Sequence, residues 1–293
     1  MVAVDDEHQL YTQLWGNQDS EQRIVFLHGG PGSGTSERAK TLFDPQKHQV
    51  LFFDQRGAGQ STPMGELHNN TTEHLVNDIE QLRQRVGWEL VELVGNSWGS
   101  CLSLTYGLAH PDRVKRMVLG GVFTGTTHEV DFIDAGRVRS HFPDVWDQYR
   151  RTVPESFKDN PSAYHIQRIL GDNLDEAKES SAAYVALEDA VSSITVPPLT
   201  AEPIELSDAD FTANRIEMSY FLNKCYLPAG FILDRAAELT MPIEIIQGRF
   251  DMACPPETAF NLARAAVNAT LHFTQAGHSV YDAANFEMYH SLI

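Results

Sequence analysis

The chain has 293 residues, of which 42% are hydrophobic and 21% are charged, so it is long enough to bury a substantial core. Acidic residues outnumber basic ones by 40 to 22, which gives a formal charge of -18 at pH 7. This balance argues against nucleic acid as a partner, because phosphate backbones bind basic surfaces, and it disfavours an anionic membrane.

The cysteines and the N-terminal residues narrow the class of protein further. Three cysteines are too few and too odd in number for a disulfide framework, and none forms the CxxC pair of a structural zinc site. Residues 1–11 lack the basic start and apolar run of a signal peptide. No apolar stretch approaches the ~20 residues that span a bilayer. We therefore expect a cytoplasmic protein.

Short, almost unbroken apolar runs alternate with helical patterns along the chain. Such runs are typical of strands in a parallel sheet whose two faces are covered by helices. The helical patterns at 72–86, 98–110 and 255–267 lie between them. The alternation predicts an α/β fold with a mostly parallel sheet and right-handed crossovers. The predicted strands are 23–28, 49–54, 91–95, 116–122, 243–247 and 271–273.

The alternation stops after Phe123. From 124 to 236 no segment has the pattern of a buried strand, and a proline-rich bend is expected at 196–203. The strand pattern returns at Ile243, which favours one sheet interrupted by a helical insertion over two consecutive domains. We predict a core formed by residues 1–123 and 237–293 and an all-helical cap formed by residues 124–236.

The motif Gly95-Asn96-Ser97-Trp98-Gly99 follows a predicted strand and precedes a predicted helix. In this context GxSxG indicates a serine on a strained strand-to-helix turn, with its hydroxyl held clear of the sheet. The outer glycines are needed because side chains there would crowd the turn or the packed helix. Ser97 is therefore predicted to be a nucleophile.

A serine nucleophile needs a base to take its proton and an acid to orient that base. Asp251 follows the predicted strand 243–247, and His278 follows the strand 271–273. Both are therefore expected with Ser97 at the carboxyl edge of the sheet, where open α/β sheets bind ligands. Singly, each residue has a simpler interpretation, as a turn or surface residue. Together, and in the order of the α/β hydrolases, they predict a catalytic triad.

The glycine-rich run His28-Gly29-Gly30-Pro31-Gly32 ends the predicted strand 23–28. Its glycines allow the backbone to approach a ligand, so we assign the oxyanion hole to the backbone N–H groups of Gly30 and Trp98. A phosphate-binding loop is the alternative, but the run matches neither of the usual patterns. The DQRGAGQS segment after the next strand is expected to form a tight turn that supports the site.

The motifs HGGPG, DQRGAGQS, GNSWGS, GRFDMACP and AGHS resemble, in this order and spacing, the proline iminopeptidase branch of the α/β-hydrolase superfamily. The match runs from about residue 10 to the end, and RIEMSYF at 215–221 is similar to the family's R-I-E-N-H-Y-F. The resemblance implies that Glu188 and Glu217 hold the free α-amine of the substrate. It also implies Phe123 and Phe221 as candidates for a proline pocket. Two carboxylates in a confined site would supply the acceptors and counter-charge that a secondary ammonium needs.

The chain departs from the family pattern at a few positions. One lies beside the nucleophile, and the others lie next to the two cap glutamates. The catalytic core is thus well matched, whereas the specificity region is matched at its acids and at its Tyr-Phe pair. The departures are Asn96 for Gly, Leu187 for Trp, and Met218-Ser219 for Asn-His.

Motifs and resemblance together predict a serine exopeptidase, a prolyl aminopeptidase that releases N-terminal proline from short peptides with a free N-terminus. The mechanism requires an acyl-enzyme on Ser97 but no metal or organic cofactor. The alternative is a related esterase or amidase that acts on a small neutral substrate with the same triad. A non-catalytic receptor is disfavoured because it has no reason to keep all three triad residues. Epoxide hydrolases and dehalogenases are disfavoured because they use an acidic nucleophile, whereas this chain has Ser97 at the elbow.

Cys254 is expected to be a packing residue close to the triad.

Overall fold

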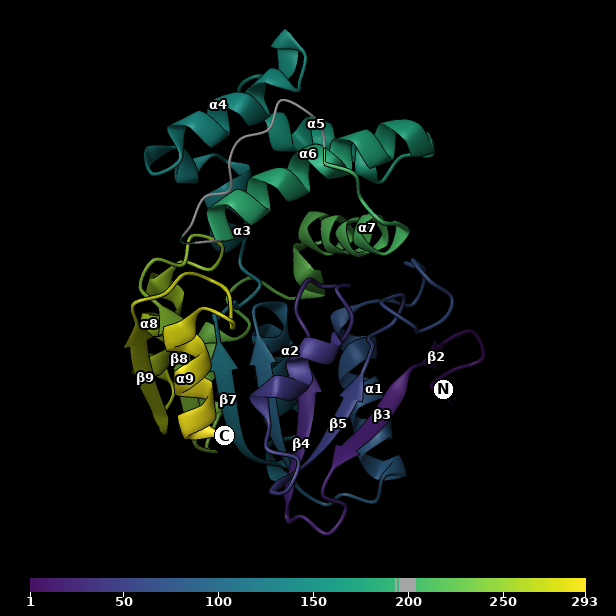
Figure 1. The fold of residues 1–293 in the computed structure, drawn as a ribbon, viewed down its shortest axis with the longest axis vertical. Coiled ribbons are helices and arrows are strands. Elements are labelled where there is room, and N and C mark those ends of the chain that lie inside the picture. The colour runs from purple at the N-terminus through teal and green to yellow at the C-terminus, as the bar shows by residue number, and fades with distance from the viewer. Residues whose placement is uncertain (193, 195–203) are drawn as a thin grey trace.

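A seven-stranded sheet forms the centre of the computed structural model, which describes residues 1–192, 194 and 204–293 (Figure 1). The spatial order of its strands is β3-β5-β4-β6-β7-β8-β9. Every neighbouring pair is parallel except β3 and β5, which run antiparallel. The proline-rich bend expected at 196–203 lies outside the described residues.

The predicted strands are confirmed with ends that differ by at most two residues, and β3 is an addition to them. The sheet strands are β3 (Thr12–Gly16), β4 (Gln22–Leu27), β5 (His48–Phe53), β6 (Val91–Asn96), β7 (Val114–Gly120), β8 (Ile243–Gly248) and β9 (Ala269–Thr274). Strand β5 is buried along its whole length, as a strand covered on both faces must be. A separate short antiparallel pair is formed by β1 (Val2–Ala3) and β2 (Gln9–Leu10).

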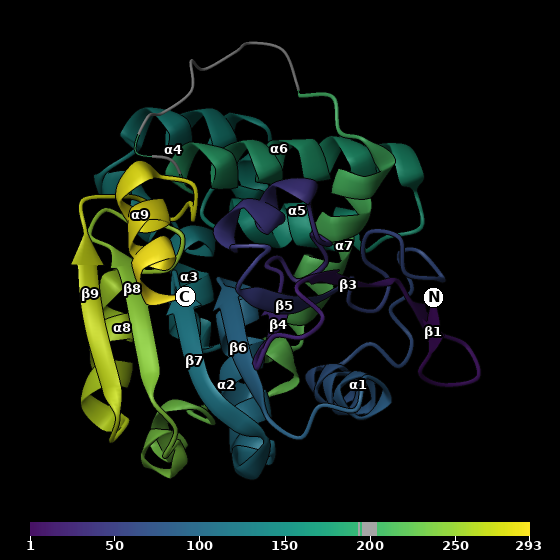
Figure 2. The same cartoon turned by 60° about the horizontal axis from the view of Figure 1, so that its bottom comes forward.

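Helices cover both faces of this sheet (Figure 2). On one face lie α1 (Thr72–Arg85), α2 (Trp98–Ala109) and α8 (Pro256–Ala265), whose apolar residues join the larger core cluster. On the other face lie α9 (Ala283–Leu292) and the 3-10 helix η1 (Glu37–Leu42). Helix α1 forms because Leu75, Ile79 and Leu82 make one buried stripe. Within the described ranges, no helix combines the length and apolarity needed to cross a membrane.

The chain between β7 and β8 forms a helical layer over the carboxyl edge of the sheet (Figure 1). The described part of 124–236 contains no strand, as expected. These helices share their own apolar cluster, which includes Trp146, Tyr149 and Tyr184. We call them the cap helices: α3 (Thr127–Asp134), α4 (Pro143–Arg151), α5 (Pro161–Ile169), α6 (Leu174–Ser192) and α7 (Asp208–Leu222).

The remaining short 3-10 helices connect these layers. Helix η6 (Leu233–Glu238) packs against α8, so the chain has returned to the sheet layer by this point. The exact division into core and cap at residues 124 and 236 stays a prediction. The others are η2 (Pro111–Arg113), η3 (Arg137–Ser140), η4 (Glu155–Phe157) and η5 (Lys224–Tyr226).

Candidate active site

Ser97 stands on the turn between β6 and α2 with φ 57° and ψ -128°. A residue with a Cβ atom rarely adopts this conformation, so the turn stores strain. The Ser97 N–H donates to the carbonyl oxygen of Gly120 at 3.0 Å, which ties the turn to β7. A Cβ atom on Gly95 would collide with the carbonyl of Gly99, and one on Gly99 would collide with that of Leu27. The two glycines therefore let α2 begin directly against the sheet.

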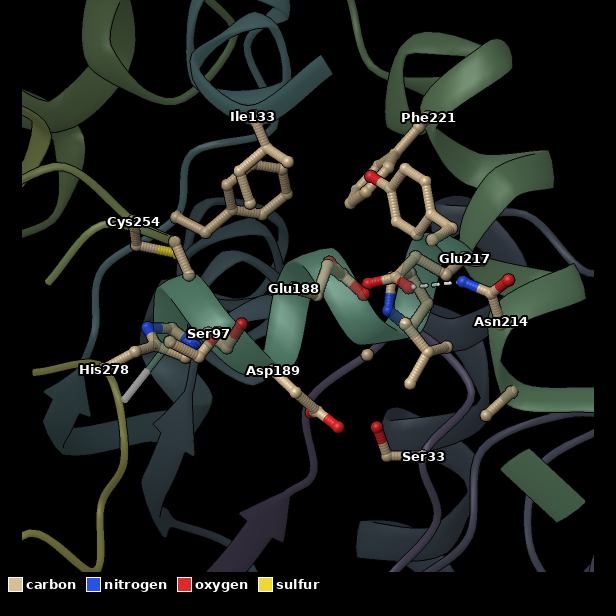
Figure 3. A pocket seen from close by; sticks show the side chains of 18 of the residues that line it. Ser33, Ser97, Ile133, Glu188, Asp189, Asn214, Glu217, Phe221, Cys254 and His278 are labelled. Atoms are coloured by element: carbon tan, nitrogen blue, oxygen red, sulfur yellow. Dashed lines mark hydrogen bonds between the residues drawn. The ribbon is translucent and has the colours of Figure 1, made fainter. Parts of the chain in front are cut away.

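Asp251 and His278 lie in the loops that follow β8 and β9, and their side chains are hydrogen-bonded. The Nδ1 atom of His278 is 2.9 Å from Oδ2 of Asp251, which is completely buried. This bond occupies Nδ1 and leaves Nε2 for a reacting group. Ser97 and His278 lie side by side at one end of a pocket (Figure 3). Three further N–H groups hold the carboxylate: Ala253 N at 3.0 Å, Cys254 N at 2.7 Å and Gln247 Nε2 at 3.1 Å.

The electrostatic surroundings of His278 favour its protonated form. Burial favours the neutral ring, but the charge of Asp251 and the hydrogen bond to it outweigh burial, so the pKa of His278 is raised above its ordinary value. The carboxyl groups of Glu188 and Asp282 act in the same direction. The imidazolium that forms when a base accepts a proton is therefore stabilised here.

The loop that carries His278 is also bonded to the cap. The backbone N–H of His278 donates to the carbonyl oxygen of Ser192, at the end of α6, at 3.2 Å. The same helix carries Glu188 one turn earlier. One cap helix thus contacts the backbone of the histidine and presents a predicted substrate-binding residue.

Of the two residues assigned to the oxyanion hole, Gly30 lies in the pocket wall and Trp98 lies behind it at the start of α2. Gly30 lines the pocket together with Ser97. Trp98 is the first residue of α2, where backbone N–H groups have no acceptor within the helix. Both positions suit donors aimed at a developing negative charge. That these two N–H groups stabilise an oxyanion stays a prediction.

The DQRGAGQS segment after β5 supports the site through hydrogen bonds to the elements around it, as expected from its sequence. The amide of Gln55 accepts from the indole N–H of Trp98 at 2.9 Å and donates to the carbonyl of His28 at 3.0 Å. The guanidinium of Arg56 forms a two-point ion pair with Asp78 of α1, with both N–O distances 2.7 Å. The segment therefore links the loop after β4, the start of α2 and helix α1.

A pocket of about 330 Å³ lies between the sheet edge and the cap helices (Figure 3). Among the described residues its wall contains acidic side chains and no Lys or Arg. Across the same part of the chain, no group of three or more His, Cys, Asp or Glu side chains could hold a metal ion. Asp251 and Trp98 lie behind the wall, and the other predicted site residues line it: Gly30, Ser97, Phe123, Glu188, Glu217, Phe221 and His278.

Glu188 of α6 and Glu217 of α7 lie next to each other in the middle of this pocket (Figure 3). Glu217 accepts a hydrogen bond from the amide of Asn214 at 3.3 Å. Burial raises the pKa of Glu217 to about 7. Burial, together with the like charge of Glu217, raises the pKa of Glu188 well above its usual range. The pair therefore gives up its protons less readily than exposed carboxyl groups, and an ammonium group placed between them would favour their ionised forms.

An apolar wall adjoins the acid pair. The rings of Phe123 and Phe221 lie 6.1 Å apart between centroids at an interplanar angle of 62°. Ile133 of α3 also lines the pocket, on the same side as Phe221 (Figure 3). An apolar wall beside paired carboxyl groups can accommodate a small apolar group that carries a cationic amine.

The positions that depart from the family pattern lie outside the wall of the pocket. Leu187 and Met218 are buried in the apolar cluster of the cap. The hydroxyl of Ser219 is 3.3 Å from that of Tyr226, and Asn96 contacts the hydroxyl of Tyr289 at 3.4 Å.

The side chain of Cys254 lies beside the nucleophile Ser97, although the two residues are far apart in the sequence. Its thiol lines the pocket and interacts with the Ser97 hydroxyl. Burial raises the pKa of this thiol above its ordinary value, which keeps it protonated. Sequence reasoning did not identify Asn214 or Tyr184, which also line the pocket, because neither belongs to a motif.

Comparisons with known proteins identify the family and the fold. The chain matches the family model of the alpha/beta hydrolase fold over residues 22–284. A proline iminopeptidase of Arabidopsis thaliana is 36% identical over 283 residues, covering 95% of this chain and 74% of that protein. A proline iminopeptidase of Xylella fastidiosa is 35% identical over 291 residues, covering 98% and 92%. The solved structure of a proline iminopeptidase of Mycobacterium smegmatis has a TM-score of 0.59 over 97% of this chain and 94% of that one, at 17% identity, which concerns the fold alone.

Proposed function

Since this chain belongs to the proline iminopeptidase family of α/β hydrolases, we propose that it removes the N-terminal proline from short peptides. Its relatives make it a hydrolase of the prolyl aminopeptidase type, a serine exopeptidase. One observation is the main support for assigning this pocket as the active site. A serine at a nucleophile elbow and a pair of carboxyl groups suited to an ammonium line the same pocket.

The proposed chemistry is acyl transfer through a covalent intermediate. Nε2 of His278 takes the proton of Ser97 while Oγ attacks the carbonyl carbon of the first residue, and Asp251 holds the imidazolium. The N–H groups of Gly30 and Trp98 stabilise the tetrahedral oxyanion. His278 then protonates the leaving amine. A water molecule, activated by the same histidine, releases the amino acid from Ser97. The His278–Asp251 bond supports these roles.

The proposed role of Glu188 and Glu217 is to hold the α-amine of the first residue. Fixing that amine places one peptide bond beside Ser97, which makes the enzyme an exopeptidase. The proline ring then lies against Phe123 and Phe221. The shared placement of all five residues in one pocket wall supports this arrangement.

The cap, taken as residues 124–236, is proposed to limit the substrates to short peptides, because the site lies beneath its helices. No step of the mechanism needs a metal or an organic cofactor. A cytoplasmic location is part of the proposal.

A panel of aminoacyl arylamides with free and blocked amines, compared with a simple activated ester, tests this function. We expect prolyl arylamide with a free amine to be cleaved fastest, and the blocked form to resist cleavage. Hydrolysis of the ester without cleavage of any arylamide would instead indicate the alternative esterase. Equal cleavage of free and blocked amides would contradict the assignment of the glutamates.

A further inference from the structure

A further carboxyl group, that of Asp134, lies behind the wall of the amine site. Asp134 is the last residue of α3, and the hydroxyl of Tyr184 donates to its Oδ1 atom at 2.9 Å. Tyr184 is only 1% exposed and lines the pocket. Tyr184 and Glu188 are four residues apart on α6, so they share one side of the helix. Asp134 is thus bonded to the helix face that presents Glu188.

Among the described residues, the side chains that bond to the Asp134 carboxyl group carry hydroxyl groups, and none of them is a cation. The hydroxyl of Ser162 on α5 also bonds to it. The arginines of the adjacent helix η3, Arg137 and Arg139, are exposed, and Arg137 contacts His128. The titratable groups that interact with Asp134 are therefore acids and phenols: Asp131 of α3, Tyr149 of α4, Tyr184 and Glu188 of α6, and Glu217 of α7.

We propose that Asp134 is a positioning residue of the amine site, which holds Glu188 through Tyr184 and adds negative charge behind the acid pair. The proposal rests on the function proposed for Glu188 and Glu217. It makes the site selective for a first residue that carries its charge as an ammonium. The geometry that supports it is the contact from α3 to Tyr184 together with the shared face of α6.

Binding is then coupled to proton release. Burial raises the pKa of Asp134 to about 7, close to that of Glu217, so near neutral pH each of these two groups is partly protonated and partly charged. When a peptide ammonium enters, it keeps its own protons, and a carboxyl group of the site loses one to solvent. The negative charge of Asp134 raises the pKa values of Glu188 and Glu217. Removing that charge should therefore let the pair ionise at lower pH.

The test compares Asp134→Asn with the wild type on two substrates, prolyl 4-nitroanilide and 4-nitrophenyl acetate, from pH 4 to 9. Asn keeps an acceptor for Tyr184 but removes the charge. We expect KM for the anilide to rise roughly 3- to 10-fold with kcat nearly unchanged. The acidic limb of kcat/KM for the anilide should move to lower pH. The acidic limb of kcat/KM for the ester should stay in place, because the ester has no amine and its limb reflects the protonation of His278 alone.

Two further variants separate a positioning role from a structural one. Tyr184→Phe keeps the ring but removes a hydrogen bond that favours the ionised form of Asp134, so KM for the anilide should rise and the acidic limb should move in the same direction as in Asp134→Asn. Asp144→Asn, at an exposed acid of the cap helix α4, is the matched control and should change neither quantity.

The outcomes distinguish this inference from the function on which it rests. If the wild type does not cleave the anilide, the proposed function itself is wrong. If the wild type cleaves it but Asp134→Asn leaves both KM and the acidic limb unchanged, the role of Asp134 is wrong. Equal losses on anilide and ester, together with a lower Tm, would show that Asp134 only supports the cap, which also overturns the inference.

Discussion

Nδ1 of His278 and Oδ2 of Asp251 lie 2.9 Å apart, although the two residues are 27 positions apart in the chain. They meet because β8 and β9 are parallel neighbours, so the loops after them leave the same edge of the sheet. The carboxylate is fully buried and already held by other N–H groups, so its charge stays fixed beneath the imidazole. This pair determines both the orientation of the histidine and the pH at which it becomes a base.

Replacing Asp251 with Asn should lower kcat by roughly 10⁴-fold, because the imidazolium loses its counter-charge and its fixed tautomer. The pH dependence has a definite sign. Asp251 raises the pKa of His278, and the base must be neutral to act. The acidic limb of the remaining activity should therefore move to lower pH, which a pH–rate profile with an activated ester would measure. A limb that does not move would contradict the pairing.

Ser97→Ala should lower kcat by roughly 10⁶-fold, which leaves the rate that the oxyanion hole and binding alone provide. Ser97→Gly should be equally inactive but more stable than the Ala variant by about 1 kcal/mol, because φ 57° is strained only when a Cβ atom is present. Urea unfolding of the two variants measures this difference. An alanine variant as stable as the glycine variant would show that the turn is not strained.

Glu217→Gln should reduce kcat/KM for prolyl arylamide roughly 100-fold, because one buried charge partner of the ammonium is lost. Hydrolysis of a simple activated ester should change less than about 3-fold, since His278 and Ser97 are untouched. Glu188→Gln should show the same split. Exposed Glu176 on the same helix provides the control, and Glu176→Gln should alter neither rate. Equal losses on both substrates would disprove the amine-binding role.

Asp78→Asn should lower the free energy of unfolding by roughly 1–3 kcal/mol, because it removes one of the two carboxylates that pair with the buried guanidinium of Arg56, the other being that of Asp5. The side chains of Arg56 and Asp78 are 3% and 0% exposed. The exposed pair Arg151–Asp147 is the control, and Asp147→Asn should change stability by less than about 0.5 kcal/mol. Urea denaturation measures both, and similar small effects would contradict a supporting role for this ion pair.

Gly99→Ala should impair both folding and activity, because the new Cβ atom would collide with the carbonyl of Leu27 beneath the nucleophile elbow. Gly87→Ala makes a matched control. Gly87 has φ +71° but nothing within 4 Å of a Cβ, so its cost should be about 1–2 kcal/mol with full activity. Thermal unfolding and ester hydrolysis report the two quantities. An active, stable Gly99→Ala variant would show that the elbow tolerates movement of α2.

Most of the fold could be predicted from the sequence because strands covered on both faces are nearly continuous in hydrophobicity. Strand β3 and helix α9 are examples of sheet-layer elements without such a signal. Strand β3 is an edge strand whose residues are only partly buried, so TQLWG has no apolar run. Helix α9 buries Asn285, which bonds to Thr274 and Gly277, and polar contacts of this kind leave no hydrophobic period.

The triad could be predicted because each member follows a strand end within a recognisable motif. The surroundings of the amine site could not. Asp134, Tyr184 and Asn214 come from three different cap helices and meet through helix packing, which no local pattern encodes. The closeness of the Cys254 thiol to Ser97 likewise depends on how two loops meet across the sheet edge.

The hydrogen bond between His278 N–H and the carbonyl of Ser192 attaches the catalytic loop to helix α6, the helix that also carries Glu188. Glu188 and Ser192 are separated by four residues, which corresponds to about 6 Å along a helix axis. The proposed anchor for the peptide's first nitrogen and the attachment to the catalytic loop are thus spaced by a single helical turn. The backbone of one helix therefore sets the spacing between the proposed amine anchor and the loop that carries the catalytic histidine.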